Sequence, residues 1–369
     1  MGRQVLALIV KELLAVLRDG RSRMMLIGPP LIQLMVFGYA ATFDLNHVPI
    51  AICNQDRSQA SRDLVARFAG SPTFNVQAML DSARRGDALI DSRRVQMVLV
   101  IDRRFTRDLY AHRPAPVQII VDGRNSNSAL LIEGYANTIL NGFALDWAAA
   151  HGYPKPPAML NLRTRYNPTL VSRWFIVPGI VALLTQVVTL LVVGLSVARE
   201  REMGTFDQLL VTPLRQIDIL IGKGMPGLLI GVFEASVIIA ATVFWFHVPL
   251  RGGLAPLYAG LLLFVIAVIG IGLAISALAA TQQQALLGAF LFMVPSIILS
   301  GFSTPIANMP AWVQVLTLIN PMRYFLVIVR SVFLEGAGFT QLAAQFWPMA
   351  AIGLVTLSAA GWLFRKRVV

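Results

Sequence analysis

Few residues of this chain have types and spacings that could carry out chemistry. The only lysines are Lys11, Lys155, Lys223 and Lys366, and none follows the G-x-x-x-x-G-K pattern of a phosphate-binding loop. The four histidines are scattered, and a single cysteine, Cys53, can form neither an internal disulfide nor a cysteine-based metal site. We therefore expect no catalytic residue, no metal site and no cofactor bound by this chain, and any ATP hydrolysis would occur on a partner.

Glu234 is the exception, because it lies in the interior of a long apolar stretch. An intramembrane carboxylate is a functional hypothesis by default, here a translocation or proton site that could also contact a cationic substrate. The alternative is a protonated or hydrogen-bonded packing residue, since no second intramembrane acid offers a relay. Lys223, between Gly222 and Gly224, is expected to snorkel to the membrane surface.

The elements that carry these groups are predicted to be membrane helices. The chain is 56% apolar and 14% charged, with a mean hydropathy of +0.67, which is too apolar for an ordinary soluble domain. Crossing ~30 Å of hydrocarbon takes about 20 mostly apolar residues. Six stretches meet that length: 24–43, 174–197, 219–246, 254–280, 284–301 and 344–364. The predicted fold class is a polytopic α-helical membrane protein with six transmembrane helices.

Residues 1–23 have a different pattern, typical of an amphipathic helix that lies at the cytoplasmic membrane surface. Its expected apolar face consists of Val5, Leu6, Ile9, Leu13, Val16 and Leu17. Lys11 and Glu12 interrupt the continuous apolar core that a signal peptide would need. In the fourth predicted span, Gly260, Gly270 and Gly272 are expected to allow close helix contact.

Residues 44–172, between the first two spans, are predicted to form a mixed α/β domain outside the membrane. Short β-branched runs predict strands at 48–54, 74–80, 95–101 and 116–123. Helical periodicity alternates with them at 58–70, 82–94, 102–111 and 127–152.

The segment 302–340, between the fifth and sixth spans, is apolar but is broken by Pro305, Pro310 and Pro321. We expect two short re-entrant helices that dip into the membrane without crossing it. The domain from 173 to 369 would thus hold five membrane helices and this segment.

Orientation follows from the basic residues that flank short loops. With six spans, three basic groups fall on one side: Arg3, Lys11, Arg18, Arg21 and Arg23, then Arg199, Arg201, Arg215 and Lys223, and finally Arg365, Lys366 and Arg367. That side is expected to be cytoplasmic. Both termini would then be cytoplasmic, and residues 44–172 would lie outside.

The segment 199–213, between the second and third spans, is predicted to be a short cytoplasmic helix. It contains the charged residues Glu200, Arg201 and Glu202, a start signal at Gly204 and Thr205, an apolar face of Phe206, Leu209 and Leu210, and a stop at Pro213. This apolar face needs a partner, and we expect another protein. The alternative is a helix that rests on lipid, against which the acidic residues argue because anionic lipid repels them.

The chain resembles the permeases of type-2 ATP-binding-cassette exporters. The resemblance rests on two motifs, ARERExGTFDQLLVTP at 198–213 and NPMRYFLVIVRSVFLEGAGF at 320–339, and on the order of one span, a large outer domain and five further spans. The outer domain, opening with NQDRSQASRDLVARF at 54–68, is similar to the subgroup that works with periplasmic adaptor proteins.

The resemblance implies a bacterial inner-membrane protein whose residues 44–172 are periplasmic. Residues 199–213 would be the coupling helix that binds a separate cytoplasmic ATPase, which holds ATP and Mg. The permease would pair with a second copy or a paralogue, with spans two and five at the seam, and would work with a membrane-fusion adaptor. The lipid bilayer is its other partner, and no nucleic acid is expected.

The function that follows is ATP-driven export of an amphipathic or hydrophobic substrate, drug or lipid-like, out of the cytoplasm or inner leaflet. Pro305, Pro310, Asn320 and Pro321 would form an outer gate. The alternative is a membrane-anchored sensor or assembly factor whose outer domain binds a ligand or adaptor without transport. An ion-driven transporter is disfavoured because no inverted repeat is found.

Overall fold

The computed structural model describes residues 2–18, 20–40, 45–153, 165–168, 171–205 and 215–368. The chain divides into two compact units, one made of Met1–Thr42 with Thr164–Val369 and the other of Phe43–Arg163. The first is helical and the second is a mixed α/β unit. We describe each by itself.

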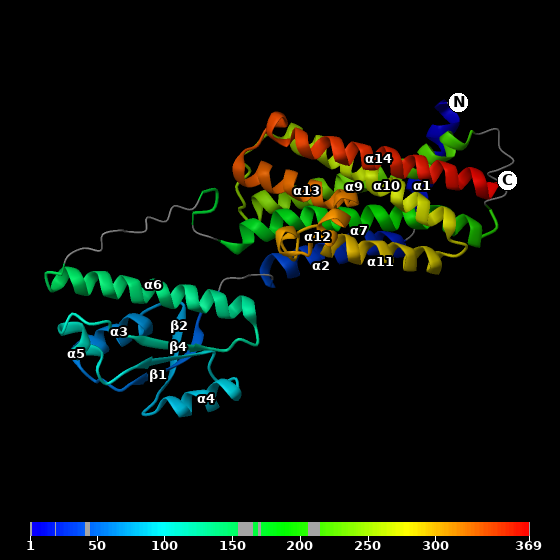
Figure 1. The fold of residues 1–369 in the computed structure, drawn as a ribbon. Coiled ribbons are helices and arrows are strands. Elements are labelled where there is room, and N and C mark those ends of the chain that lie inside the picture. Colours follow the sequence, from blue (N-terminus) through cyan, green and yellow to red (C-terminus); the bar gives the residue numbers. More distant parts are fainter. Residues whose placement is uncertain are drawn as a thin grey trace. The chain divides into compact units, whose positions relative to one another are not determined.

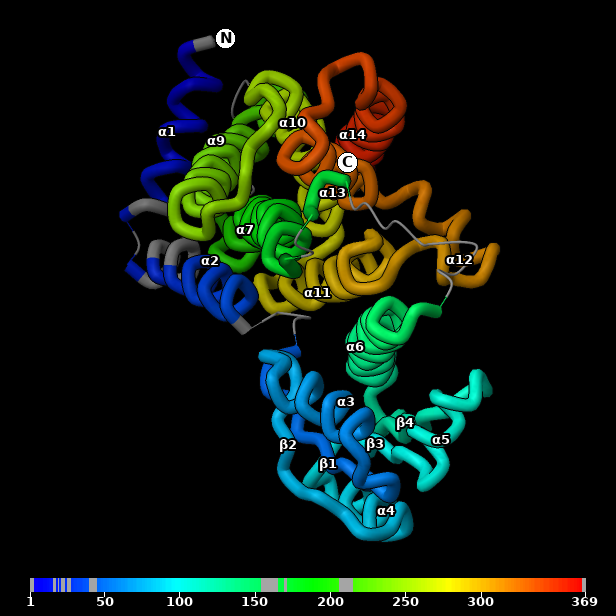
Figure 2. Tube along the Cα trace, turned by 90° about the vertical axis from the view of Figure 1, so that its left-hand side faces the viewer, coloured from blue at the N-terminus to red at the C-terminus, as the bar shows by residue number. Residues whose placement is uncertain are grey.

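The long helices of the helical unit pack side by side (Figure 1). They are α1 Gly2–Arg18, α2 Gly20–Ala40, α7 Ser172–Glu202, α9 Gln216–Phe244, α10 Leu254–Leu278, α11 Gln282–Ile298 and α14 Phe339–Val368. Helix α7 is central, because it packs against α2, α9, α10 and α11 (Figure 2). Most of its residues are buried, which explains why this stretch is apolar on all sides.

Four of these helices are long and apolar enough to cross a membrane: α7, α9, α10 and α14. They correspond to the second, third, fourth and sixth predicted spans, although α9 and α10 each end two residues earlier than predicted. Helix α11 is apolar but has only 17 residues, and α2 contains Pro29 and Pro30. The described part of the chain is therefore a helical membrane protein with four apolar spans, or five if a bent pair of short helices counts as one. The number six stays a prediction.

The bent pair lies where the sequence predicts re-entrant helices. Its elements are η1 Ile306–Asn308, α12 Ala311–Leu316, η2 Thr317–Ile319, α13 Pro321–Arg330 and the π-helical η3 Ser331–Glu335. The stretches Ala311–Ile319 and Pro321–Glu335 meet at 86°, as in a re-entrant loop or a broken span. Pro305 and Pro310 each directly precede a short helix and Pro321 begins one, where the missing N–H of proline costs no helical hydrogen bond.

Glycines of α10 allow its close packing, as predicted. A Cβ at Gly270 would lie 2.7 Å from the backbone nitrogen of Leu357 in α14, and one at Gly260 would lie 2.9 Å from Ile328 of α13. Any larger residue would separate these helices, so the glycines serve helix contact here.

The α/β unit has a four-stranded sheet in the order β2-β1-β3-β4. The strands are β1 Val48–Asn54, β2 Phe74–Met79, β3 Met97–Ile101 and β4 Val117–Val121, and the helices are α3 Gln59–Ala69, α4 Ala83–Asp91, α5 Phe105–Tyr110 and α6 Ser126–Ala150. Strand β1 is parallel to both β2 and β3, whereas β3 and β4 are antiparallel. The predicted alternation of strands and helices is confirmed.

Helices cover both faces of this sheet (Figure 1). On one face, Ile50 and Ile52 of β1 pack in a core with Leu64 and Phe68 of α3 and with Ile132 of α6. On the other face, Ala51 and Val98 pack with residues of α4. Because alternate residues of β1 pack in opposite cores, the strand is apolar up to Cys53 and only its last residue, Asn54, is polar.

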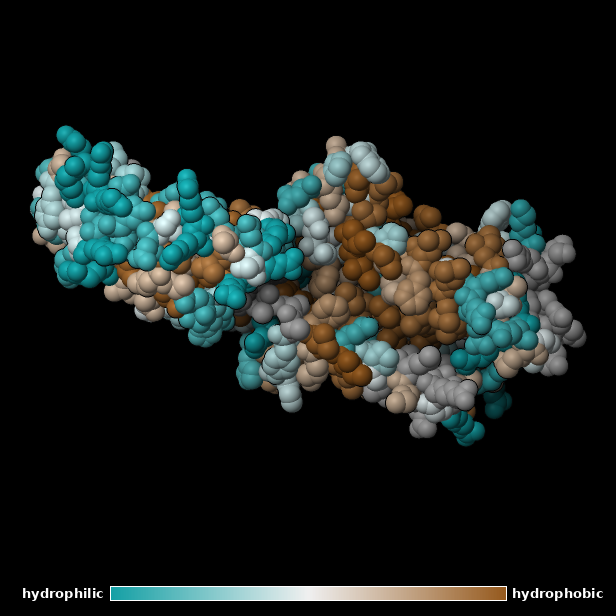
Figure 3. All heavy atoms as spheres, turned by 90° about the horizontal axis from the view of Figure 1, so that it is seen from below, coloured by the Kyte–Doolittle hydropathy of each residue, from teal (hydrophilic) through white to brown (hydrophobic). Residues whose placement is uncertain are grey.

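The two units differ in their surfaces. In the face drawn in Figure 3, the helical unit shows a broad hydrophobic area and the α/β unit is mostly hydrophilic. Exposed apolar side chains of α11, such as Leu287, Phe290 and Leu291, are typical of a surface that faces lipid or another membrane chain.

Candidate coupling site

Helix α7 extends into the predicted coupling segment, 199–213, and ends there in a glycine-based cap. Gly204 has a φ of +68°, the left-handed conformation that glycine adopts without steric cost. Its N–H donates to the carbonyl of Arg201 (3.1 Å), and the N–H of Thr205 donates to that of Glu200 (3.0 Å), which is a Schellman motif. The sequence pattern predicts a start signal for the next helix at Gly204 and Thr205. In the structure these two residues close α7, and residues 206–214, where the next helix would begin, lie outside the described ranges.

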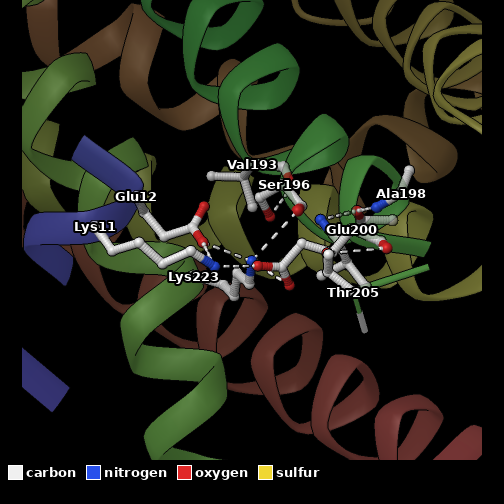
Figure 4. A network of polar contacts seen from close by, with 10 residues as sticks. Lys11, Glu12, Val193, Ser196, Ala198, Glu200, Thr205 and Lys223 are labelled. Carbon is white, nitrogen blue, oxygen red and sulfur yellow. Dashed lines mark hydrogen bonds and ion pairs between the residues drawn. The ribbon is translucent and has the colours of Figure 1, made fainter. Parts of the chain in front are cut away.

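Four charged side chains meet at this end of α7, and we call Lys11, Glu12, Glu200 and Lys223 the charge cluster (Figure 4). The Nζ atom of Lys11 lies 2.6 Å from Glu200 Oε1, and that of Lys223 lies 2.6 Å from Glu200 Oε2 and 2.8 Å from Glu12 Oε1. Glu200 is 3% exposed and Lys223 is 1% exposed. Two ammonium groups and two carboxylates balance one another, as buried charges require.

A close contact between α1 and α9 brings the cluster together. A Cβ at Gly222 would overlap Leu8 Cδ2 and would lie 2.8 Å from Leu8 Cγ, so only glycine lets the two helices approach this closely. Leu8 is buried, whereas Leu6 is 60% exposed. The face of α1 that packs on the protein therefore contains Leu8 and Glu12, and Leu6 of the predicted apolar face points away from it.

The prediction that Lys223 snorkels to the surface is wrong. The ammonium group of Lys223 donates hydrogen bonds to Glu12 (2.8 Å) and to the carbonyl of Ser196 (3.4 Å), and it forms an ion pair with Glu200 Oε2 at 2.6 Å. Sequence reasoning also gave Lys11 and Glu12 no partner, because Glu200 and Lys223 are about two hundred residues away along the chain. The available signal was a lysine within an apolar helix, which needs a buried carboxylate.

Lys11 is the most exposed member of the cluster. Burial alone would lower the pKa of Lys11, but the hydrogen bond and the charge of Glu200, together with the charge of Glu12, outweigh that effect and raise it above 10.5. Lys11 is therefore charged at neutral pH.

The next two residues connect α7 to other helices. Arg201 donates to the carbonyls of Ala277 (2.8 Å) and Ala279 (3.2 Å) at the end of α10. Glu202 Oε2 accepts from the N–H of Gln282 (2.8 Å), the first residue of α11. The positive charge of Arg201 is favourable at the C-terminal end of α10, and the negative charge of Glu202 is favourable at the N-terminal end of α11, because of the helix dipoles. Residues 200–202 thus connect the end of α7 to α1, α9, α10 and α11.

The other predicted site residues lie elsewhere or outside the described residues. Phe206, Leu209, Leu210 and Pro213 belong to the undescribed segment 206–214. Glu234 is on α9, and both its carboxylate oxygens are buried with no hydrogen-bond partner among the described residues. In the described ranges, no three His, Cys, Asp or Glu side chains gather as a metal site.

Asn320 joins the bent pair to the helical core. Its side chain caps α13, and its Nδ2 donates to the carbonyl of Ser296 of α11 (2.7 Å). The Ser296 hydroxyl lies 2.9 Å from Asn320 Oδ1 and 3.3 Å from Oε1 of Gln186 in α7. All three side chains are buried. The predicted gate residue is thus part of a polar network that reaches α7.

Comparisons with known proteins identify the family of the chain and several of its relatives. The sequence profile of the family described as "ABC-2 family transporter protein" matches residues 22–362. Over the full length of both chains, the sequence is 39% identical to "Probable multidrug ABC transporter permease YbhR" of Escherichia coli K12. It is 34% identical to "Probable multidrug ABC transporter permease YbhS" of the same strain, over 90% of this chain and 89% of that one. It is 30% identical to "Inner membrane transport permease YhhJ" of the same strain, over 99% of this chain and 98% of that one.

These matches confirm the resemblance at the level of the family. The chain is a multi-pass inner-membrane permease subunit of an ABC transporter, and its ATPase is a separate chain. By its sequence, the chain belongs to the ABC-2 family of transporter proteins.

Proposed function

We propose that this permease exports amphipathic or hydrophobic molecules, drug or lipid-like, from the cytoplasm or the inner leaflet. YbhR and YbhS are named as multidrug permeases, and the similarity to both supports this substrate class. Broad apolar surfaces on the long helices suit varied hydrophobic molecules.

The observation that carries the proposal is the double ion pair of Glu200 at the end of α7. Residues 199–213 would be the coupling helix, with Phe206, Leu209 and Leu210 against a groove of the ATPase. The helices would have two packed arrangements, and ATP-driven closure of the ATPase dimer would shift the population of the transporter from one arrangement to the other. Because Glu200 holds α1 and α9 through lysines, a displacement of the coupling segment would be transmitted to both helices.

The same proposal includes an orientation. Six spans would place both termini in the cytoplasm and residues 44–172 in the periplasm, with α1 at the cytoplasmic surface. The basic residues at the end of α14, Arg365 and Lys366, favour this side. ATP and Mg would be bound by the ATPase, and this chain would bind neither.

Two further partners belong to the proposal. A second permease chain would complete the transport path, either another copy or a paralogue, as the similarity to both YbhR and YbhS from one strain suggests. The exposed apolar face of α11 is compatible with such a seam. A periplasmic membrane-fusion adaptor would meet the α/β unit.

The bent pair would form the outer gate. Asn320 would hold its turn against α11 and α7 through Ser296 and Gln186, and Pro305, Pro310 and Pro321 would fix its short helices. Glu234 remains the candidate for a translocation or proton site, because its carboxylate has no described partner.

Transport into inside-out vesicles tests the function. Vesicles with the permease and its ATPase should take up ethidium, an amphipathic cation, when ATP is added. Vesicles that lack the ATPase, or that contain an ATPase unable to hydrolyse ATP, should not. Equal uptake in both would contradict ATP-driven export, and uptake driven by a pH gradient alone would indicate an ion-driven transporter.

A further inference from the structure

The end of α13 carries a buried arginine without a carboxylate partner. The Nε and Nη2 atoms of Arg330 are buried and have no hydrogen-bond partner among the described residues. Its Nη1 atom donates to the carbonyl of Gly301 (3.4 Å). None of the ion pairs that the described ranges contain includes Arg330. No described group therefore neutralises this charge, unlike that of Lys223 in the charge cluster.

Helix α7 forms the surface on which this side chain lies. The guanidinium carbon of Arg330 is 3.7 Å from the ring centroid of Phe175, in the first turn of α7. One turn further along, a Cβ at Gly179 would lie 2.7 Å from the ring of Phe302 and 3.5 Å from Arg330 Nη2, so glycine leaves room for both. Phe302 follows α11 in the sequence. Arg330 thus connects α13 to α7 and to the chain after α11, at the opposite end of α13 from Asn320.

These contacts offset only part of the cost of burying the charge. A cation over the face of an aromatic ring is attracted to it, and the carbonyl of Gly301 adds one hydrogen bond. Removing an unpaired charge from water costs more than such contacts return, whereas an apolar side chain of similar size has no such cost. A π-helical turn, η3, also begins directly after Arg330, and such turns frequently lie at functional sites. The position of α13 against α7 is therefore specific but easily released.

From these contacts we infer that Arg330 is the releasable contact between the bent pair and α7. While the guanidinium lies on Phe175, α13 is held against α7 and the proposed outer gate is closed. When the gate opens, the guanidinium moves from the ring into water, and its recovered hydration favours the open arrangement. The inference rests on the proposed gate, and it names the residue that sets the balance between its two arrangements.

Thermal unfolding of the purified permease tests the cost of the buried charge. Arg330→Met keeps a long side chain but removes the charge, and it should raise the unfolding midpoint by about 2–4 °C. Arg323→Met is the matched control on the same helix. Arg323 donates to the hydroxyl of Thr317 and to the carbonyl of Gln314, so its charge has hydrogen-bond partners and its replacement should not raise the midpoint.

A double-mutant cycle tests the contact with the ring. Phe175→Leu should lower the midpoint of the wild type, because leucine has no aromatic face for the guanidinium. In the Arg330→Met background the same change should have a smaller effect, since no cation lies on the ring. Equal effects in the two backgrounds would show that the ring and the guanidinium do not stabilise each other, and would overturn the inference.

Hydrogen exchange in the permease–ATPase complex tests the release. With ATP and vanadate, which trap the closed ATPase, the amides of residues 321–335 of the wild type should exchange at least about threefold faster than without nucleotide. Arg330→Met should show little acceleration, and its export of ethidium should fall at least about threefold. Both effects follow because the closed gate of this variant is more stable.

A midpoint that Arg330→Met leaves unchanged or lowers, or exchange that it accelerates as the wild type does, would overturn the inference. The unfolding and exchange measurements need no transport. A wild type that passes both but takes up no ethidium into vesicles would contradict the export proposal alone, so the two can fail separately.

Discussion

Glu200 neutralises two lysines at once, although it lies at the end of an apolar helix. Replacing Glu200 with Gln would leave the fully buried Lys223 with Glu12 as its only carboxylate. Removing one partner of a buried ion pair typically costs about 3–5 kcal/mol. We therefore expect Glu200→Gln to lower the thermal unfolding midpoint of the purified permease strongly.

Glu202→Gln is the matched control, because it makes the same chemical change two residues further along α7. Glu202 is exposed and bonds Gln282, and exposed charged contacts are worth about 0–1 kcal/mol. Its midpoint should stay close to that of the wild type. Equal shifts in the two variants would show that burial of the cluster has no special role.

Asp56 offers a test by pH within the α/β unit. Burial alone would raise the pKa of Asp56, but hydrogen bonds from Ser58 and from Thr106 (2.6 Å) outweigh it and lower the pKa below the usual 3.8. A carboxyl whose folded pKa is depressed stabilises the fold above its unfolded pKa, and this contribution is lost as the pH falls through the folded pKa. The wild type should thus be more stable than Asp56→Asn at neutral pH, and the difference should shrink below about pH 4.

Cys53 can report this difference, because it is the only cysteine and is buried in β1. A pyridyl disulfide that reacts with thiols in acid would label it when the α/β unit unfolds. The measurement is the temperature of half-maximal labelling at each pH. A difference between wild type and Asp56→Asn that is constant from neutral pH to pH 3 would contradict the role of the charged carboxylate.

At the scale of elements, the contact of α1 with α9 depends on Gly222. Gly222→Ala would place a methyl group against Leu8, and the whole leucine side chain would have to move because its Cγ is also within 2.8 Å. We expect α1 to separate from α9 and the amides of residues 3–15 to exchange hydrogen at least several times faster, as measured by mass spectrometry.

Two variants make this test specific. Gly194→Ala changes a glycine of α7, and the new methyl group would meet no described atom within 4 Å. Like Gly222→Ala, it should raise the helix propensity by about 1 kcal/mol. It should leave exchange in α1 unchanged. Adding Leu8→Ala to Gly222→Ala should restore slow exchange, and failure of this rescue would argue against steric contact as the cause.

Local elements were predictable from the sequence, whereas contacts between distant elements were not. The run 48–54 is β1 residue for residue, because a β-branched apolar run bounded by polar turn residues leaves few alternatives. The role of Gly204 in closing α7 was not predicted, since a glycine between two helical patterns fits either end. The partners of Lys223 were missed because pairing across the fold leaves no periodicity in the sequence.

For the whole transporter, energy must pass from the ATPase into a permease that has no nucleotide site of its own, and residues 199–213 are the proposed route. Replacing Phe206 with Asp would bury an unpaired carboxylate in the groove of the ATPase. Such a change typically costs several kcal/mol, which reduces affinity by about two orders of magnitude or more. We expect the variant to insert and dimerise but to lose its ATPase during purification, and export should stop.

Glu202→Ala is the control for this last test, because it shortens a side chain that contacts Gln282 within the same chain and leaves the apolar face intact. It should keep the ATPase at nearly wild-type yield. If this helix instead rested on lipid, Phe206→Asp would weaken its contact with the membrane and leave ATPase binding normal, because the ATPase would not touch the apolar face. Co-purification of the ATPase with Phe206→Asp at wild-type yield would therefore rule out the coupling-helix assignment.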